Sequence, residues 1–124
     1  MKTIDVRLLD EKDEEIADAL VFLGMSRHAA RTITYLQNVD GATSSELESG
    51  TGLRQPEVSI AAKDLEERGW INRREEKKPG KGRPHKIYSL KIKFDDIIAL
   101  LEEQQKIGFE EAQLKIGRLK ELKQ

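Results

Sequence analysis

The first apolar positions along the chain have the spacing of an amphipathic helix over 14–24. Its stripe comprises Ile16, Leu20 and Leu23, widened by Val21 and Phe22. Gly24 follows, and glycine readily adopts the left-handed conformation just past a helix end. A second helical pattern covers 26–39, where Ser26 can act as the N-cap. Its inward face comprises Ala29, Ala30, Ile33 and Leu36, and the sequence DGA at 40–42 then predicts a turn.

Two further short helices are predicted between residues 43 and 69. Thr43 and Glu46 form a capping box at the start of the first, and the sequence SGTG at 49–52 should stop it quickly. Pro56 marks the first turn of the second, because the missing N–H costs little there. The buried stripe of this second helix comprises Val58, Ala61 or Ala62, and Leu65, and Gly69 ends it.

These two helices meet the requirements of a helix-turn-helix. Such a motif needs apolar residues on both helices and a turn residue that tolerates positive φ. The required residues occur in order: Leu47, Gly52, Leu53, Val58 and Ala61. The outward face of the second helix, about 55–68, then carries side chains suited to base edges and phosphates of a major groove: Arg54, Gln55, Ser59 and Lys63. The alternative is an ordinary helical hairpin in a bundle.

A basic hairpin follows directly and favours the helix-turn-helix. The sequences WINRRE and HKIYSL predict two short strands, joined by a loop that contains glycine and proline. Segment 54–91 has 11 basic and 6 acidic side chains, a net charge of +5, whereas the whole chain has a net charge of −1. A localised basic segment is typical of a polyanion-binding surface, although a merely solvated loop is the alternative. The candidate DNA contacts on this hairpin, 73–86, are Lys77, Lys78, Lys81, Arg83 and Lys86.

The pattern is helical again from Phe94 to Lys123, and its apolar surface is broader than one short domain needs. Heptad spacing of three of its leucines and isoleucines favours pairing with a second copy. We therefore expect a DNA-binding domain over 1–92 and a dimerisation helix over 93–124, although two glycines could break the helix near Gly108. The candidate dimerisation residues are Ile97, Leu100, Leu101, Ile107, Ala112, Leu114, Ile116 and Leu119.

Three stretches, ELESGTGLRQPEVS, DLEERGWI and GKGRPHKIYSL, resemble archaeal TrmB-like and MarR/ArsR-like transcriptional regulators. The resemblance covers roughly residues 13–91. It implies a winged helix-turn-helix fold, mainly α with a small β-hairpin wing, and a C-terminal dimerisation helix. It also implies a homodimer on operator DNA, with the second helix in the major groove and the wing on the backbone or minor groove. Glu48 replaces the usual alanine and should loosen the helix packing, and Trp70 replaces the usual leucine.

Catalytic, metal and cofactor chemistry has no supporting pattern. The chain has no cysteine, and its two histidines, His28 and His85, complete no metal site. We expect His28 on a helix surface, and His85 either near a DNA backbone or without a role. Adjacent glutamates on a helix point in different directions, and the GKGRP sequence lies between strands, unlike a phosphate-binding loop. We therefore expect neither an enzyme nor a cofactor protein, and no effector is indicated.

Location and partners complete the expectations. No apolar run approaches bilayer length, and the N-terminus lacks a secretory signal, so we expect a soluble cytoplasmic protein. The expected partners are double-stranded DNA and a second copy of the chain, with no membrane. The alternative function is a winged-helix protein-interaction module in a larger complex, without direct DNA binding.

Overall fold

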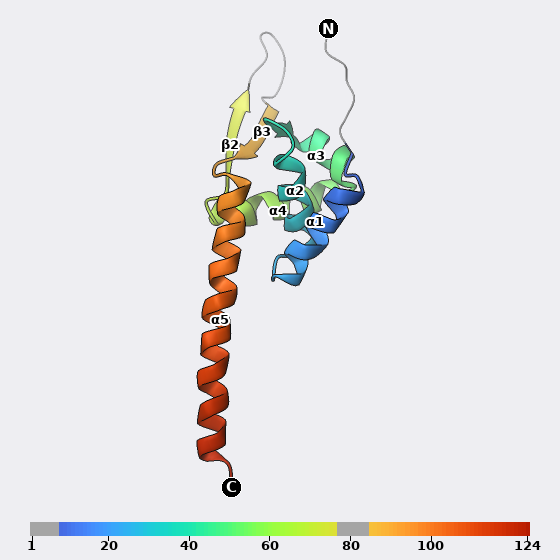
Figure 1. The fold of residues 1–124 in the computed structure, drawn as a ribbon. Coiled ribbons are helices and arrows are strands. Elements are labelled where there is room, and N and C mark those ends of the chain that lie inside the picture. The colour runs from blue at the N-terminus through green and yellow to red at the C-terminus, as the bar shows by residue number, and fades with distance from the viewer. Residues whose placement is uncertain (1–7, 77–84) are drawn as a thin grey trace. The chain divides into compact units, whose positions relative to one another are not determined.

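The computed structural model describes residues 8–76 and 85–124, and Figure 1 shows its fold. The chain divides between Lys93 and Phe94 into two compact units. In order, the described elements of the first unit are α1 (Glu11–Phe22), α2 (Arg27–Leu36), β1 (Ala42–Thr43), α3 (Ser44–Thr51), α4 (Gln55–Glu67), β2 (Ile71–Glu76) and β3 (His85–Leu90). The second unit is formed by α5 (Phe94–Leu122). The predicted fold class, mainly α with a small β-hairpin wing, is confirmed.

The helices α1 and α2 begin at side-chain caps. Asp10 accepts a hydrogen bond from the Asp13 N–H at 2.9 Å, and Asp13 accepts one from the Asp10 N–H at 3.0 Å. Ser26 caps α2 as predicted, because its Oγ accepts a hydrogen bond from the Ala29 N–H at 3.1 Å. The link between them contains Gly24, whose φ of +109° is a conformation that other residues rarely adopt.

One expectation for α1 is wrong. Its buried face comprises Asp13, Ala17 and Leu20, and Phe22 does not widen it, since that side chain is 89% exposed. Two residues correspond to about 200° of rotation around an α-helix, so Phe22 lies on the side opposite Leu20. Val21 is also exposed.

The helix-turn-helix is formed by α3 and α4. Thr43 accepts from the Glu46 N–H at 3.1 Å and Glu46 accepts from the Thr43 N–H at 2.9 Å, which confirms the capping box. The helix ends at Thr51, within the predicted stop at 49–52, and Gly52 caps it with a φ of +77°. The apolar residues expected to lock the two helices together are buried: Leu47, Leu53, Val58 and Ala61.

The strands form one antiparallel sheet in the order β1-β3-β2. Tyr88 in the central strand lies opposite Ala42 on one side and Arg73 on the other. β1 was predicted only as part of a turn, because two residues are too short to show the two-residue period of a strand. It joins the segment before α3 to the hairpin, so the position of the wing is tied to that of the helix-turn-helix.

Aromatic side chains complete the core of the first unit. Trp70 is buried, and the Arg68 guanidinium lies 5.0 Å from the centre of its ring, within cation–π range. Tyr35 and Tyr88 are buried as well. The sheet and the four helices therefore share one apolar interior.

α5 is one uninterrupted helix of 29 residues, so the break that was possible near Gly108 does not occur. A glycine costs about 1 kcal/mol in a helix, and the surrounding leucine, glutamate, lysine and glutamine residues are good helix formers. Among the candidate dimerisation residues, Ile97 and Leu101 are buried. The exposed candidates are Leu100, Ile107, Ala112, Leu114, Ile116 and Leu119. In the described ranges, none of the helices combines the length and the apolar character that crossing a bilayer requires.

Candidate nucleic-acid interface

The outward face of α4 carries the predicted base-reading residues. Gln55, Ser59 and Lys63 are spaced four residues apart, so they line one side of the helix, and all three are exposed. The Gln55 Nε2 donates a hydrogen bond to the Ser59 Oγ at 3.1 Å. Ile60 on the same helix is also exposed. The structure therefore presents a short polar row along α4, from its first residue to Lys63.

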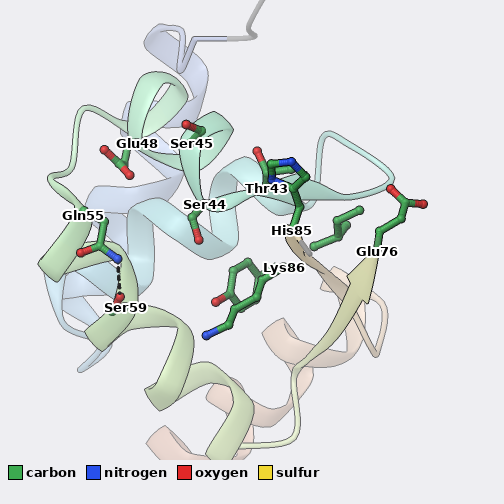
Figure 2. A pocket seen from close by; sticks show the side chains of 11 residues that line it. Thr43, Ser44, Ser45, Glu48, Gln55, Ser59, Glu76, His85 and Lys86 are labelled. Atoms are coloured by element: carbon green, nitrogen blue, oxygen red, sulfur yellow. Dashed lines mark hydrogen bonds between the residues drawn. The ribbon is translucent and has the colours of Figure 1, made fainter. Parts of the chain in front are cut away.

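This row borders a groove of about 610 Å³ between the helix-turn-helix and the wing strands, seen in Figure 2. We call it the α4–wing groove. It is lined by Thr43, Ser44, Ser45, Glu48, Gln55, Ser59, Glu76, His85, Lys86, Ile87 and Tyr88. A second hollow of about 350 Å³ shares three of these residues and adds Ala62, Lys63, Glu66 and Arg73. The two hollows together extend along α4 from Gln55 to Glu66.

Cations and anions both line these hollows. Lys63 and Lys86 are exposed cations, while the Arg73 Nε is paired with the Glu66 Oε2 at 3.2 Å. Glu48 and Glu76 add carboxylates to the α4–wing groove. The surface is thus a polar strip of mixed charge in which the lysines are available for phosphates.

The sequence did not identify every lining residue. Glu48 was considered only for its effect on helix packing, yet its side chain lies on the groove, as Figure 2 shows. Ser44 and Ser45 were not considered at all. Two adjacent serines at the start of a helix could have indicated that they line the groove, because small polar side chains there leave space for a partner to approach.

Arg54 lies just before α4 and has an acidic neighbour. Its backbone N–H donates to the Glu57 Oε1 at 2.9 Å, and its guanidinium Nη2 lies 3.7 Å from the Glu57 Oε2. The backbone hydrogen bond lowers the pKa of Glu57 from its ordinary value. Glu57 therefore stays ionised near neutral pH and holds the exposed Arg54 side chain near the helix start.

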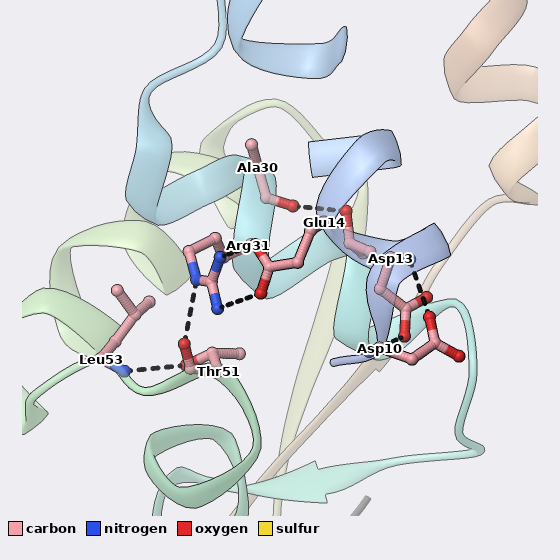
Figure 3. Close-up of polar contacts among 8 residues, drawn as sticks. Asp10, Asp13, Glu14, Ala30, Arg31, Thr51 and Leu53 are labelled. Carbon is pink, nitrogen blue, oxygen red and sulfur yellow. Dashed lines mark hydrogen bonds and ion pairs between the residues drawn. The ribbon is translucent and has the colours of Figure 1, made fainter. Parts of the chain in front are cut away.

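Arg31 supports the turn that precedes α4, as Figure 3 shows. Its Nε donates to the Thr51 carbonyl oxygen at 2.9 Å, and its two terminal nitrogens donate to the Glu14 carboxylate at 2.5 and 3.0 Å. The hydrogen bond from Arg31 lowers the pKa of Glu14. One side chain of α2 thus joins α1 to the end of α3, and no local sequence pattern could have revealed these long-range contacts.

The turn itself is braced by a threonine hydroxyl. The Thr51 Oγ1 donates to the Leu47 carbonyl oxygen at 2.6 Å and accepts from the Leu53 N–H at 3.2 Å. Together with Arg31, this hydroxyl sets the entry of the chain into α4, which carries the polar row. The orientation of the polar row therefore depends on Arg31 and Thr51, which lie outside it.

The histidines and the wing complete the predicted set. His28 is partly buried, not on the surface, and its Nδ1 is buried without a hydrogen-bond partner. His85 and Lys86 lie on the groove, while Lys77, Lys78, Lys81 and Arg83 fall outside the described residues. Over the ranges that the structure describes, no group of three or more histidine, aspartate or glutamate side chains could hold a metal ion.

The helix order, the glycine turn and the three-stranded sheet define a winged helix-turn-helix protein. Residues 23–82 match the sequence model of the MarR family, which confirms the predicted resemblance. Over this segment the chain is similar to winged-helix transcription regulators of the MarR family. Among curated proteins, none matches it.

Solved structures with the same fold include regulators from archaea and bacteria. A possible transcriptional regulator from Methanosarcina mazei Go1 is 21% identical, with a TM-score of 0.58 over 92% of this chain and 88% of that one. TrmBL2, an archaeal chromatin protein, is 20% identical, with a TM-score of 0.61 over 90% of this chain and 40% of that one. MepR, a regulator of the Staphylococcus aureus efflux pump MepA, is 18% identical, with a TM-score of 0.51 over 90% and 88%. At these identities the likeness shows the fold.

Proposed function

We propose that the protein is a cytoplasmic, homodimeric transcription regulator that binds specific sequences in double-stranded DNA. α4 enters the major groove, and the wing, 73–86, contacts the backbone or the minor groove. The observation that carries this proposal is the aligned and exposed row of Gln55, Ser59 and Lys63 beside the α4–wing groove. A helix with such a row next to a wing matches the way that helix-turn-helix proteins dock on DNA.

Each residue of the row has a role that follows from its chemistry. The Gln55 amide can form a bidentate pair with adenine, and the Ser59 hydroxyl can bond to any base. Their mutual hydrogen bond of 3.1 Å limits the rotamers of Gln55 before DNA arrives. Lys63 and Lys86 contact phosphates, as do Lys77, Lys78 and Lys81 in the wing. Arg54 reads the end of the site, and Arg83 enters the minor groove.

The dimer is formed through α5. Its exposed apolar side chains have no partner within the described chain, whereas a second copy would cover them. The proposed contacts are Leu100, Ile107, Ala112, Leu114, Ile116 and Leu119. Ile97 and Leu101, the other two candidates, are buried and do not belong to this exposed surface. Two DNA-binding units in one particle explain why an operator with two half-sites is expected.

Selection of bound fragments from a random duplex library tests the proposal. For the wild-type protein we expect enrichment of duplexes that contain one motif in two copies. For Gln55→Ala we expect the same motif without its base preference at one base pair of each copy. A library that shows no enrichment, or a motif that Gln55→Ala leaves unchanged, would contradict the docking of α4. Lys63→Ala is the matched control, because it removes an exposed side chain from the same face and should preserve the motif.

The carboxylates of Glu48 and Glu76 in the α4–wing groove favour a second candidate, a winged-helix module that binds a protein instead of DNA. A phosphate backbone repels carboxylates, whereas a basic peptide would pair with them. Salt separates the two candidates. If the protein binds DNA through several phosphates, its affinity for duplex DNA should fall steeply as the salt concentration rises. If the protein binds no duplex of the library even at low salt, the protein-interaction candidate is favoured.

A further inference from the structure

The exposed apolar surface of the described chain is concentrated on α5. Eight of its twelve large exposed hydrophobic side chains belong to this helix: Ile98, Leu100, Ile107, Phe109, Leu114, Ile116, Leu119 and Leu122. Exposed apolar side chains that gather on one helix in this way often mark an interaction site. The nature of the partner can be read from the charges that accompany these side chains.

Charge is divided along α5 into two halves of opposite sign. From Asp95 to Glu111 the helix carries six acidic residues and one basic residue, a net charge of −5. From Ala112 to Lys123 it carries four basic residues and one acidic residue, a net charge of +3. The boundary falls near the middle of a helix of 29 residues.

Helix capping does not explain this division. The helix dipole favours acidic residues in the first turn and basic residues in the last, but its influence fades within one turn of each end. It accounts for Asp95, Asp96 and Lys120. It does not account for Glu102, Glu103, Glu110 and Glu111, which lie two or more turns inside the helix. Within the described residues of α5, one ion pair is formed, Arg118–Glu121 at 3.1 Å.

We propose that α5 pairs with α5 of a second copy in the antiparallel direction, so that the acidic half of each helix lies along the basic half of the other. A parallel pair would place −5 beside −5 and +3 beside +3. Charges that flank an apolar seam set the choice of partner and its direction in paired helices. This inference rests on the dimer in the proposed function and adds its geometry.

The antiparallel direction sets the distance between the two points at which the DNA-binding units join the helix pair. A helix of 29 residues is about 44 Å long at 1.5 Å per residue. Each DNA-binding unit continues from the N-terminus of α5, so the two points of attachment lie at opposite ends of the pair. The separation of these points, about 44 Å along the helix axis, exceeds the roughly 34 Å of one DNA turn.

Distances between spin labels on the intact protein test the direction. The chain has no cysteine, so each variant carries one label at the chosen position of each copy. Gln124→Cys places the label just past the end of α5, and Lys106→Cys places it near the midpoint; both side chains are exposed. An antiparallel pair should give a distance of roughly 45–50 Å at position 124 and a much shorter one at position 106.

Two other outcomes would overturn the proposal. A short distance at both positions means a parallel pair. An absence of dipolar coupling at both, in variants with wild-type helix content, means that α5 does not pair. Neither outcome affects the proposal that α4 reads DNA, because the Gln55→Ala selection measures that property independently. The midpoint label is the matched control, since it is close to its copy in either direction.

Discussion

Gln55 and Lys63 lie two turns apart on the same face of α4, yet their chemistry predicts different effects on DNA binding. Gln55→Ala removes an amide that can pair with one base, so discrimination at one base-pair position should fall by roughly 1–3 kcal/mol. Lys63→Ala removes a phosphate contact, so all sequences should weaken about equally, and the salt slope should fall by about one unit. Titration of duplexes with single base changes checks both expectations.

The comparison is informative because the two residues share their surroundings. Both are exposed and both belong to α4, so a shift of the whole helix would alter both variants alike. If Gln55→Ala weakens every duplex uniformly, its amide contacts the backbone and not a base. If Lys63→Ala changes the order of preferred sequences, the assignments of the two residues are reversed.

The pair of Glu14 and Arg31 predicts a dependence of stability on pH. The hydrogen bond from Arg31 lowers the pKa of Glu14 from 4.5, so the folded state binds a proton less readily than the unfolded state. The stabilisation is therefore present above about pH 4.5 and is lost as the pH falls through the lower folded pKa. Glu14→Gln should reduce the free energy of unfolding at neutral pH and flatten its decline in acid.

Urea unfolding at neutral pH and at about pH 3 measures this effect. Glu15→Gln is the matched control, because Glu15 is the exposed neighbour of Glu14 on α1. It should leave the pH dependence unchanged. Equal behaviour of the two variants would show that the Arg31 contact contributes nothing to stability.

At the level of elements, two glycines with equal space around them should respond in opposite directions to alanine. A Cβ added at Gly52 or Gly108 would meet no atom within 4 Å, so packing does not distinguish them. Gly52 ends α3 with a φ of +77°, a conformation that costs other residues about 1–2 kcal/mol. Gly108 lies inside α5, where alanine is favoured by about 1 kcal/mol.

We therefore expect Gly52→Ala to lower the unfolding temperature and Gly108→Ala to raise the stability of α5. Thermal unfolding followed by circular dichroism measures both. Gly52→Ala should also weaken DNA binding in proportion to its effect on folding, because the turn orients α4. A neutral Gly52→Ala would show that the turn can be made without the left-handed conformation.

The prediction from the sequence agrees with the structure where an apolar pattern repeats over many residues. It fails where an element is very short or where a contact joins segments that are far apart in the sequence. The helices were predictable because their apolar stripes repeat over several turns, and Gly52 was predictable because only a turn explains a glycine there. β1 was not predictable, since two residues show no period. The Arg31 contacts and the position of Glu48 on the groove arise only when segments far apart in the sequence come together. Gly108 shows that one weak residue does not end a strong helix.

At the level of the whole molecule, the charge pattern of α5 predicts how salt affects the proposed dimer. In the antiparallel pair opposite charges face each other, so screening should weaken association as salt rises. In a parallel pair like charges face each other, and salt should strengthen it. Sedimentation equilibrium at low and high salt gives the sign. A chain that ends at Lys93 should be monomeric at every salt concentration, and a dimer of that chain would place the interface outside α5.

The basic segment between β2 and β3 should contribute to DNA binding mainly through charge. Lys77, Lys78, Lys81 and Arg83 follow a strand that is tied, through β3 and β1, to the segment preceding α3. Their combined replacement by alanine should reduce the slope of log affinity against log salt by up to about four units, because each lost phosphate contact releases roughly one fewer counterion. The fold should persist, since every buried residue of the described core is left unchanged.

A change in net charge alone could mimic this result, so the control must remove equal charge elsewhere. Replacing Lys12, Lys91, Lys93 and Lys106 by alanine does so at exposed positions that do not line either groove. Because exposed charges beyond about 10 Å are screened at moderate salt, this control should change the slope far less than the wing variant does. If the two variants behave alike, the wing acts only through the overall charge of the protein. If neither changes the affinity for duplex DNA, the hairpin is a solvated turn, and the polar groove beside α4 is better explained as a site for a protein.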